Sequence, residues 1–421
     1  MASTNKNHPR HPLKEMGTTE FVIMMAALMS ITALSIDTML PALPHIGQEL
    51  HVADPNDRQM IITLFMMGLG IGSLIYGPMS DRFGRRPVLM VAAGLQLLST
   101  FICVIAPSFD ILLLARLIAG LSIASCRVVA VSIVRDCFQG DAMARIMSLI
   151  MVTFIIVPVL APSVGSLVLL VAPWRAIFGL LVMMIVGLGI WQYLRLPETL
   201  PPENRVAIGV SDLWRTFLMV VTNRNSIGHM LASGIMMGGL IGFLVSIQQI
   251  FFDVFHAGDF FPIGFALITM WMGLGGLLNS RLVERVGARR LSQGAVIVLI
   301  LLSLVHCVLI VSGHEHLVTF IIIQSITTTC FSFSGANFSA ISLEPFTRGV
   351  GLASSIQAAL TTLLSTVLGG IVGASFDGTV LPLSVGFLVF GTLAFFLIAW
   401  AERWRLFARP GHANLRKGNY V

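Results

Sequence analysis

The sequence predicts an all-α membrane protein whose twelve transmembrane helices form two pseudo-symmetric six-helix bundles. Three observations predict this class: the composition, the number of long apolar stretches, and a repeat that relates the two halves. Of the 421 residues, 56% are hydrophobic and 11% are charged, and the mean hydropathy is +0.89. A water-soluble domain carries about a quarter charged residues, so most of this surface is expected to face hydrocarbon.

Twelve apolar stretches are long enough to cross a membrane. A helix needs about 20 apolar residues to span the bilayer core, and it satisfies its own backbone hydrogen bonds there. The predicted spans are residues 18–43, 58–77, 88–106, 110–135, 143–171, 175–195, 226–252, 261–283, 291–312, 317–342, 350–374 and 382–403.

Basic residues predict how these spans are oriented, because Lys and Arg in short loops accumulate on the cytoplasmic side. With twelve spans, only Arg58 and Arg175 fall on the side opposite the N-terminus. Arg116 and Arg127 fall inside the fourth span, and the other 22 basic residues share the N-terminal side. We therefore expect both termini in the cytoplasm.

The chain is expected to divide into two bundles joined by a polar linker. The linker opens on the proline-rich stretch from Leu196 to Asn204, which cannot continue a helix, and a short amphipathic helix is predicted from Asp212 to Asn223. The expected segments are a tail at 1–17, a bundle at 18–195, the linker at 196–225, a second bundle at 226–404 and a tail at 405–421.

The two halves share a weak repeat in the loop after their second spans. Residues 77–86 read GPMSDRFGRR and residues 280–289 read SRLVERVGAR, so an acid, an arginine, a glycine and a final arginine recur in register. Duplicated six-helix units often enclose a central binding site between the two halves.

Several other classes of function are not supported. The net charge of +6 is accounted for by cytoplasmic loops, and no basic run with interleaved aromatic residues indicates a nucleic-acid partner. The five cysteines lie within or at the ends of apolar segments, without CxxC spacing or paired histidine ligands. Neither a disulfide framework nor a metal site is expected, and no organic cofactor is expected.

The first of the repeated loops resembles the signature loop of the major facilitator superfamily. The matching positions are Gly77, Asp81, Arg82, Gly84, Arg85 and Arg86, with Met79 where leucine is usual. The resemblance implies that Arg85 pairs with Asp136, that Asp81 approaches the start of the eleventh span, and that the charges latch one bundle to the other. The alternative is that these arginines only follow the distribution of positive charge across the membrane.

A second resemblance concerns Arg116 and Asp37. The stretch from Leu112 to Gly120 is similar to the R-x-x-Q-G element of drug:proton antiporters, with Ala119 in place of glutamine, and 35–44 resembles an element of the Bcr/CflA subfamily. A buried arginine is costly unless partnered, and Asp37 is its best candidate partner. An acid beside a guanidinium stays ionised, whereas a separated one takes up a proton. A salt bridge that never titrates is the alternative.

The fifth span contains a third similar element. Pro158, Pro162 and Gly165 share one helical face and resemble the antiporter element G-P-x-x-G-G, with Ala161 and Ser166 where glycines are usual. These residues are expected to form a closely packed seam, and helix packing without a gating role is the alternative.

Polar residues in the spans that line the cavity of this fold are candidates for binding substrate. Arg127 lies three turns after Arg116, so both project from one face of the fourth span, and a positive charge there favours anionic substrates. Snorkelling to the cytoplasmic surface is the alternative. The remaining candidates, each of which could instead make a hydrogen bond between helices, are Gln248, Gln249, Gln324 and Asn337. His306 is expected to pack on an outer helix.

The expected function is export of small organic molecules, such as antibiotics or metabolites, in exchange for protons by alternating access. Asp37 is expected to carry the proton and Arg116 to tune its affinity, with the proton gradient as the energy source. The expected protein is a monomer, not an enzyme, in the bacterial inner membrane. The alternatives are a proton symporter, a dedicated metabolite exporter or, of another class, a polytopic enzyme or a channel.

Overall fold

The computed structural model describes residues 16–205, 210–346 and 350–407, and every regular element assigned there is a helix. Eleven helices among these residues are long and apolar enough to cross a membrane. A further helix, α6 (Gly140–Val171), occupies the place of the predicted fifth span, and its stretch Ile156–Val171 is apolar. The predicted tails lie almost entirely outside the described residues.

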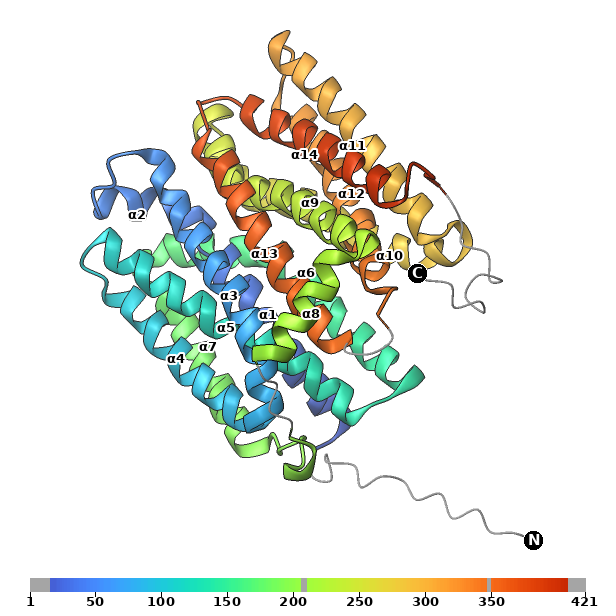
Figure 1. Cartoon of the computed structure of the whole chain (residues 1–421). Coiled ribbons are helices and arrows are strands. Elements are labelled where there is room, and N and C mark those ends of the chain that lie inside the picture. The colour runs from blue at the N-terminus through green and yellow to red at the C-terminus, as the bar shows by residue number, and fades with distance from the viewer. Residues whose placement is uncertain (1–15, 206–209, 347–349, 408–421) are drawn as a thin grey trace.

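The first bundle contains the helices that precede the linker, drawn from blue to green in Figure 1. Its first span is α1 followed by the short elements η1 and α2. The bounds are α1 (Thr18–Asp37), η1 (Leu40–Ala42), α2 (Leu43–Glu49), η2 (Pro55–Gln59), α3 (Met60–Phe83), α4 (Arg85–Ile105), α5 (Phe109–Cys137), α6 and α7 (Arg175–Arg195).

The second bundle follows the linker and is drawn from yellow-green to red (Figure 1). The linker contains η3 (Pro202–Asn204) and α8 (Val210–Thr222), which confirms a helix there, beginning two residues earlier than predicted. The remaining bounds are α9 (Arg224–Gln249), η4 (Ile250–Val254), η5 (Gly258–Phe260), α10 (Phe261–Val286), α11 (Ala288–Val311), α12 (Leu317–Leu343), α13 (Val350–Ala374) and α14 (Leu381–Ala401).

The first span differs from its prediction, because its helix ends at Asp37. Pro41 has no N–H to donate to the Asp37 carbonyl four residues earlier, and its ring would collide with that carbonyl in a continuous helix. The chain therefore turns through η1 before it resumes as α2. The break exposes backbone polar groups around residue 37 inside the bundle.

The two bundles meet where α3 packs against α13 and α6 packs against α10. At the end opposite the linker, Gln59 donates to the side chain of Gln249, and Gln249 Nε2 donates to Asn56 Oδ1 at 2.9 Å. At the linker end, a Cβ on Gly77 would lie 3.1 Å from the Ser355 hydroxyl. The bundles are thus in contact at both ends, through η2 and α9 at one end and through α3 and α13 at the other.

The repeat seen in the sequence has the same backbone in both halves. Gly84 ends α3 with φ 100° and ψ 156°, and Gly287 ends α10 with φ 96° and ψ 144°. Non-glycine residues essentially never adopt this conformation. In each case the next helix starts at the following residue, so the glycine allows two spans to be joined by a single residue.

Replacing Gly84 with alanine is expected to lower the free energy of unfolding by about 1–3 kcal/mol. The backbone conformation would be strained, and the new Cβ would lie 2.5 Å from Glu198 Oε2. The control is Gly94→Ala in α4, where a Cβ meets nothing within 4 Å. Thermal unfolding of the detergent-purified proteins measures the difference, and equal midpoints for both variants would contradict the prediction.

Candidate functional site

Asp37 lies at the break in the first span and is buried, with 5% of its surface exposed. Within the described part of the chain, its carboxyl group takes part in no hydrogen bond or ion pair. The fifth span packs directly against this break, because a Cβ on Gly165 would lie 1.8 Å from the Thr38 carbonyl oxygen and 3.1 Å from Pro41 Cγ. Gly165 therefore allows α6 to approach the backbone beside Asp37.

Arg116 is fully enclosed, but its contacts are not the expected ones. Its Nη2 donates to the Ser35 carbonyl oxygen at 3.0 Å and its Nε to that of Ile61 at 3.3 Å. The guanidinium also lies 4.1 Å from the centroid of the Phe65 ring. The expected ion pair with Asp37 is absent from the contacts of the described residues. The break leaves backbone carbonyl oxygens without partners inside the helix. The Arg116 guanidinium binds the one at Ser35, two residues before Asp37, and not the Asp37 carboxylate.

The Arg127 side chain is exposed. It is offset from the buried Arg116 by 11 residues, which is about 20° around the helix. The side of α5 that carries Ile111 and Leu114, which are 41% and 58% exposed, lies roughly opposite. Arg127 therefore points away from the lipid side, and among the described residues its guanidinium forms no hydrogen bond or ion pair.

The amide candidates divide into two groups. Asn337 bonds to Asn279 Oδ1 at 2.8 Å and joins α12 to α10, and Gln249 joins the bundles through Gln59 and Asn56. For these two, the hydrogen bond between helices is the correct interpretation rather than cavity lining. Gln324 is fully buried and neither of its amide atoms has a partner, and Gln248 Nε2 also has none. These two remain candidates for binding.

The prediction that Arg85 pairs with Asp136 is confirmed. Arg85 Nε lies 2.9 Å from Asp136 Oδ2, and Nη1 binds Asp81 Oδ1 at 2.5 Å and Ser80 Oγ at 2.7 Å. All these partners belong to the first bundle, so the charges tie helices within one bundle. The predicted link between bundles at this loop is made instead by Gly77. The predicted approach of Asp81 to the eleventh span falls partly on residues 347–349, outside the described residues.

The sequence did not reveal that Glu198 organises this loop. Its carboxylate accepts hydrogen bonds from the backbone N–H groups of Arg85 at 2.9 Å and Arg86 at 3.2 Å. These groups begin α4, where a helix leaves its N–H groups unpaired and favours a negative charge. Arg86 reaches the Tyr193 carbonyl oxygen at 2.6 Å, whereas Arg82 is exposed. The sign of this role in the sequence is that Glu198 is an acidic residue within the proline-rich linker.

The antiporter-like element in α6 is only partly in contact with the first span. Pro162 and Gly165 are buried and Pro158 is partly buried. At the start of α7, Trp174 Nε1 donates to Glu49 Oε2 at 2.5 Å and Arg175 pairs with the same carboxylate. The start of the sixth span is thereby fastened to the end of α2, and the fifth span packs against the break between α1 and α2.

Comparison with known proteins identifies the family. The family model described as Major Facilitator Superfamily matches residues 24–346. The chain belongs to this superfamily. It is therefore a membrane transporter, and the resemblance of its signature loop, built around Arg85 and Gly84, is confirmed.

Bacterial relatives of this superfamily transporter cover most of its length. The uncharacterized MFS-type transporter YdgK of Bacillus subtilis is 30% identical over 404 residues, which are 91% of this chain and 96% of that protein. The bicyclomycin resistance protein homolog of Haemophilus influenzae is 28% identical over 278 residues, 65% and 69% of the two chains. Multidrug resistance protein D of Escherichia coli is 26% identical over 265 residues, 58% and 67%. These names agree with the Bcr/CflA-like subfamily.

Solved structures of the superfamily share the fold. The D-xylose-proton symporter aligns with a TM-score of 0.72 and 14% identity over 92% of this chain and 97% of its own. The human organic anion transporter MFSD10 aligns with a TM-score of 0.65 and 17% identity over 91% and 99%. At these identities, the two structures support the arrangement of helices only.

Replacing Arg85 with glutamine is expected to destabilise the first bundle by about 2–4 kcal/mol, because Asp136 and Asp81 lose the cation between them. Arg82→Gln is the control, since the Arg82 side chain is exposed and lies over the neighbouring Phe83 ring. Thermal unfolding of the purified proteins measures both changes. A smaller loss for Arg85→Gln than for Arg82→Gln would contradict the assignment.

Proposed function

We propose that this transporter exports small organic molecules in exchange for protons. The observation that carries the proposal is the enclosed Asp37 carboxyl at the break in the first span, without a counter-ion among the described residues. An ionised carboxylate in such a site is costly, so the group favours binding a proton. Relatives named for resistance to bicyclomycin and to multiple drugs support export rather than uptake.

Movement of the chain at the break in the first span would allow Asp37 to bind and release this proton. Arg116 holds the backbone at Ser35, and Gly165 packs on the backbone at Thr38, so both contact the chain on either side of Asp37. A small shift of α1 against α5 would bring the carboxyl towards the guanidinium, which favours the ionised form. Proton release would then accompany the change between the two states of the transporter.

The charge of Arg127 favours substrates with an anionic group. This guanidinium is unpaired among the described residues, faces away from lipid, and lies about 15 Å from the linker end of α5 at 1.5 Å per residue. An arginine binds carboxylate or phosphate groups through two parallel hydrogen bonds. Amides such as Gln324, whose polar atoms lack partners, would add hydrogen bonds to the same substrate.

The setting of this exchange is the inner membrane of a bacterium, with both termini in the cytoplasm and the protein acting as a monomer. The distribution of basic residues supports this orientation, since Lys and Arg concentrate at the linker end. No cofactor is required, because the proton gradient supplies the energy.

Replacing Asp37 with asparagine is expected to reduce substrate transport driven by a pH gradient to the background of empty proteoliposomes, since an amide carries no exchangeable charge. Substrate exchange at equal pH should persist. Asp110→Asn, an exposed acid at the start of α5, is the control and should retain gradient-driven transport. Full proton-coupled transport by Asp37→Asn would refute the role of this residue.

Replacing Arg127 with glutamine is expected to weaken binding of an anionic substrate by about 10–100-fold, because a charged hydrogen bond contributes about 1.5–3 kcal/mol. Arg127→Lys keeps the charge and should lose less. Competition assays with matched anionic and cationic drugs in proteoliposomes compare the two variants. Equal losses for anionic and cationic drugs would show that Arg127 does not select substrate charge.

A further inference from the structure

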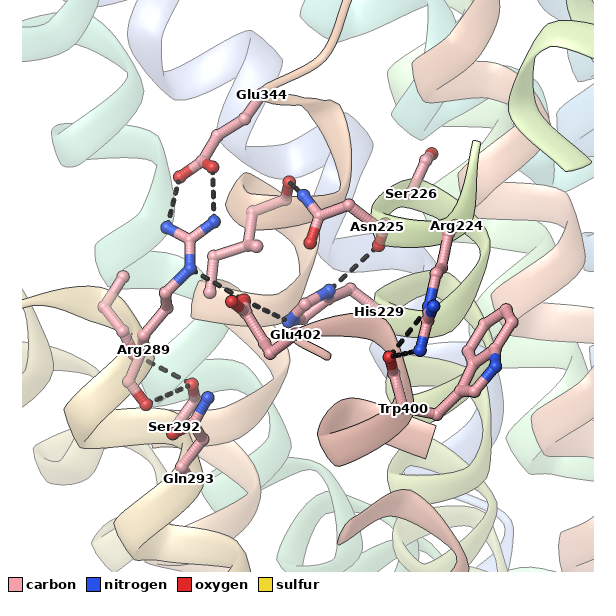
Figure 2. Close-up of polar contacts among 12 residues, drawn as sticks. Arg224, Asn225, Ser226, His229, Arg289, Ser292, Gln293, Glu344, Trp400 and Glu402 are labelled. Atoms are coloured by element: carbon pink, nitrogen blue, oxygen red, sulfur yellow. Dashed lines mark hydrogen bonds and ion pairs between the residues drawn. The ribbon is translucent and has the colours of Figure 1, made fainter. Parts of the chain in front are cut away.

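A buried histidine lies among charged groups at the linker end of the second bundle. His229, in α9, is completely enclosed. Around it lie Arg289 in the first turn of α11, Glu344 immediately after α12 and Glu402 immediately after α14, as Figure 2 shows. We call these four residues the His229 cluster. None of them takes part in the site proposed around Asp37.

The hydrogen bonds of His229 leave one ring nitrogen unsatisfied. Its Nδ1 lies 2.9 Å from the Asn225 carbonyl oxygen, which can only accept, so Nδ1 carries a hydrogen. Its Nε2 is buried without a hydrogen bond, and it faces Glu402 Oε1 at 3.5 Å. In a neutral imidazole with hydrogen on Nδ1, Nε2 is an acceptor. Two acceptors would then face each other in a buried site.

Arg289 determines which partner holds the missing hydrogen. Its Nε binds the same Oε1 atom of Glu402 at 2.7 Å, and its Nη atoms bind Glu344 at 2.7 and 3.1 Å. A guanidinium only donates hydrogen bonds, so this Oε1 atom acts as an acceptor and has no hydrogen to offer His229. Two carboxylates share one guanidinium, so the cluster lacks one positive charge while His229 is neutral.

Other groups around the ring do not supply this charge. Arg224, at the start of α9, donates to the Trp400 carbonyl oxygen and lies over the Trp400 ring. Where α8 and α13 pack near this end, the buried residues Val220, Ala353 and Ile356 are apolar, and the buried Thr216 and Gln357 carry no charge. From α12, the Phe338 ring lies 5.9 Å from the imidazole. Among the described residues, the charges acting on His229 are those of Glu402, Arg289 and Glu344.

A second buried histidine beside an acid has no unsatisfied ring nitrogen. His306 in α11 also faces an acid, with Nε2 at 2.9 Å from Glu315 Oε1, and its Nδ1 lies 2.8 Å from the Ser384 hydroxyl. One hydrogen on Nε2 satisfies this arrangement, because the serine can donate to Nδ1. His306 thus needs no second hydrogen, whereas His229 does.

We propose that His229 is a second proton-binding site of this transporter, at which an imidazolium donates from Nε2 to Glu402. Proton binding turns a contact between two acceptors into an ion pair and balances the charge of the His229 cluster. It joins the start of α9 to the ends of α12 and α14 through Arg289. In the proposed orientation this end faces the cytoplasm, so the proton comes from that side.

The test follows the ten histidines by ¹⁵N NMR of the full-length labelled protein in nanodiscs, between about pH 5 and 9. His229→Gln assigns the signal. In the wild type, both ring nitrogens of His229 are expected to carry hydrogen at the acid end and Nε2 to lose it as the pH rises. In Glu402→Gln, the negative charge beside Nε2 is lost, so the protonation of His229 should move at least about one pH unit lower.

Two results would overturn the proposal. One is a wild-type His229 that stays neutral throughout the range, and the other is a Glu402→Gln protein whose His229 titrates as in the wild type. If Glu402→Gln does not fold, Glu344→Gln replaces it and should shift the titration in the same direction by less. The His306 signal is the internal control and should be the same in the wild type and in each variant. Because no transport is measured, failure here is distinct from failure of the exchange mechanism at Asp37.

Discussion

The absence of hydrogen-bond partners in hydrocarbon is the constraint on which this structure depends. Each span must satisfy its own backbone, and every polar side chain must find a partner inside the protein or face a water-filled space. Arg116 meets the requirement with carbonyl oxygens and an aromatic ring, and Arg85 meets it with two carboxylates. Asp37 and Arg127 do not meet it among the described residues, which is why we assign transport chemistry to them.

The repeated loop has the same glycine and arginine features in both halves, but the groups around it differ. Gly84 and Gly287 have nearly the same backbone conformation, and an arginine after each binds an acid at the end of the second span that follows, Asp136 in α5 and Glu344 immediately after α12. The two halves differ in what a second nearby acid contacts. Glu198 binds backbone N–H groups in the first half, whereas Glu402 faces a buried histidine in the second. Proton chemistry is therefore proposed for both bundles, in different places.

Sequence reasoning was accurate where interactions are local or follow a family pattern. The helix bounds agree with the predicted spans to within a few residues, and the pairing of Arg85 with Asp136 was anticipated. The ion pair expected between Arg116 and Asp37 is absent from the contacts in the described part of the chain, because the guanidinium binds backbone carbonyl oxygens, which a list of side chains does not contain. Sequence reasoning left open whether Gln249 and Asn337 line the cavity or bond between helices, and the structure shows the bonds between helices.

The sequence by itself determined the number of spans and the glycines that end α3 and α10, and it contains the cause of the break at Pro41, although a continuous first span was predicted. These features follow from bilayer thickness and from backbone chemistry within a few residues, so a linear pattern contains them. Only the tertiary structure decided which distant polar groups meet, as His229 and Glu402 do. Those contacts depend on how helices rotate and pack against one another, and no spacing along the chain specifies that geometry.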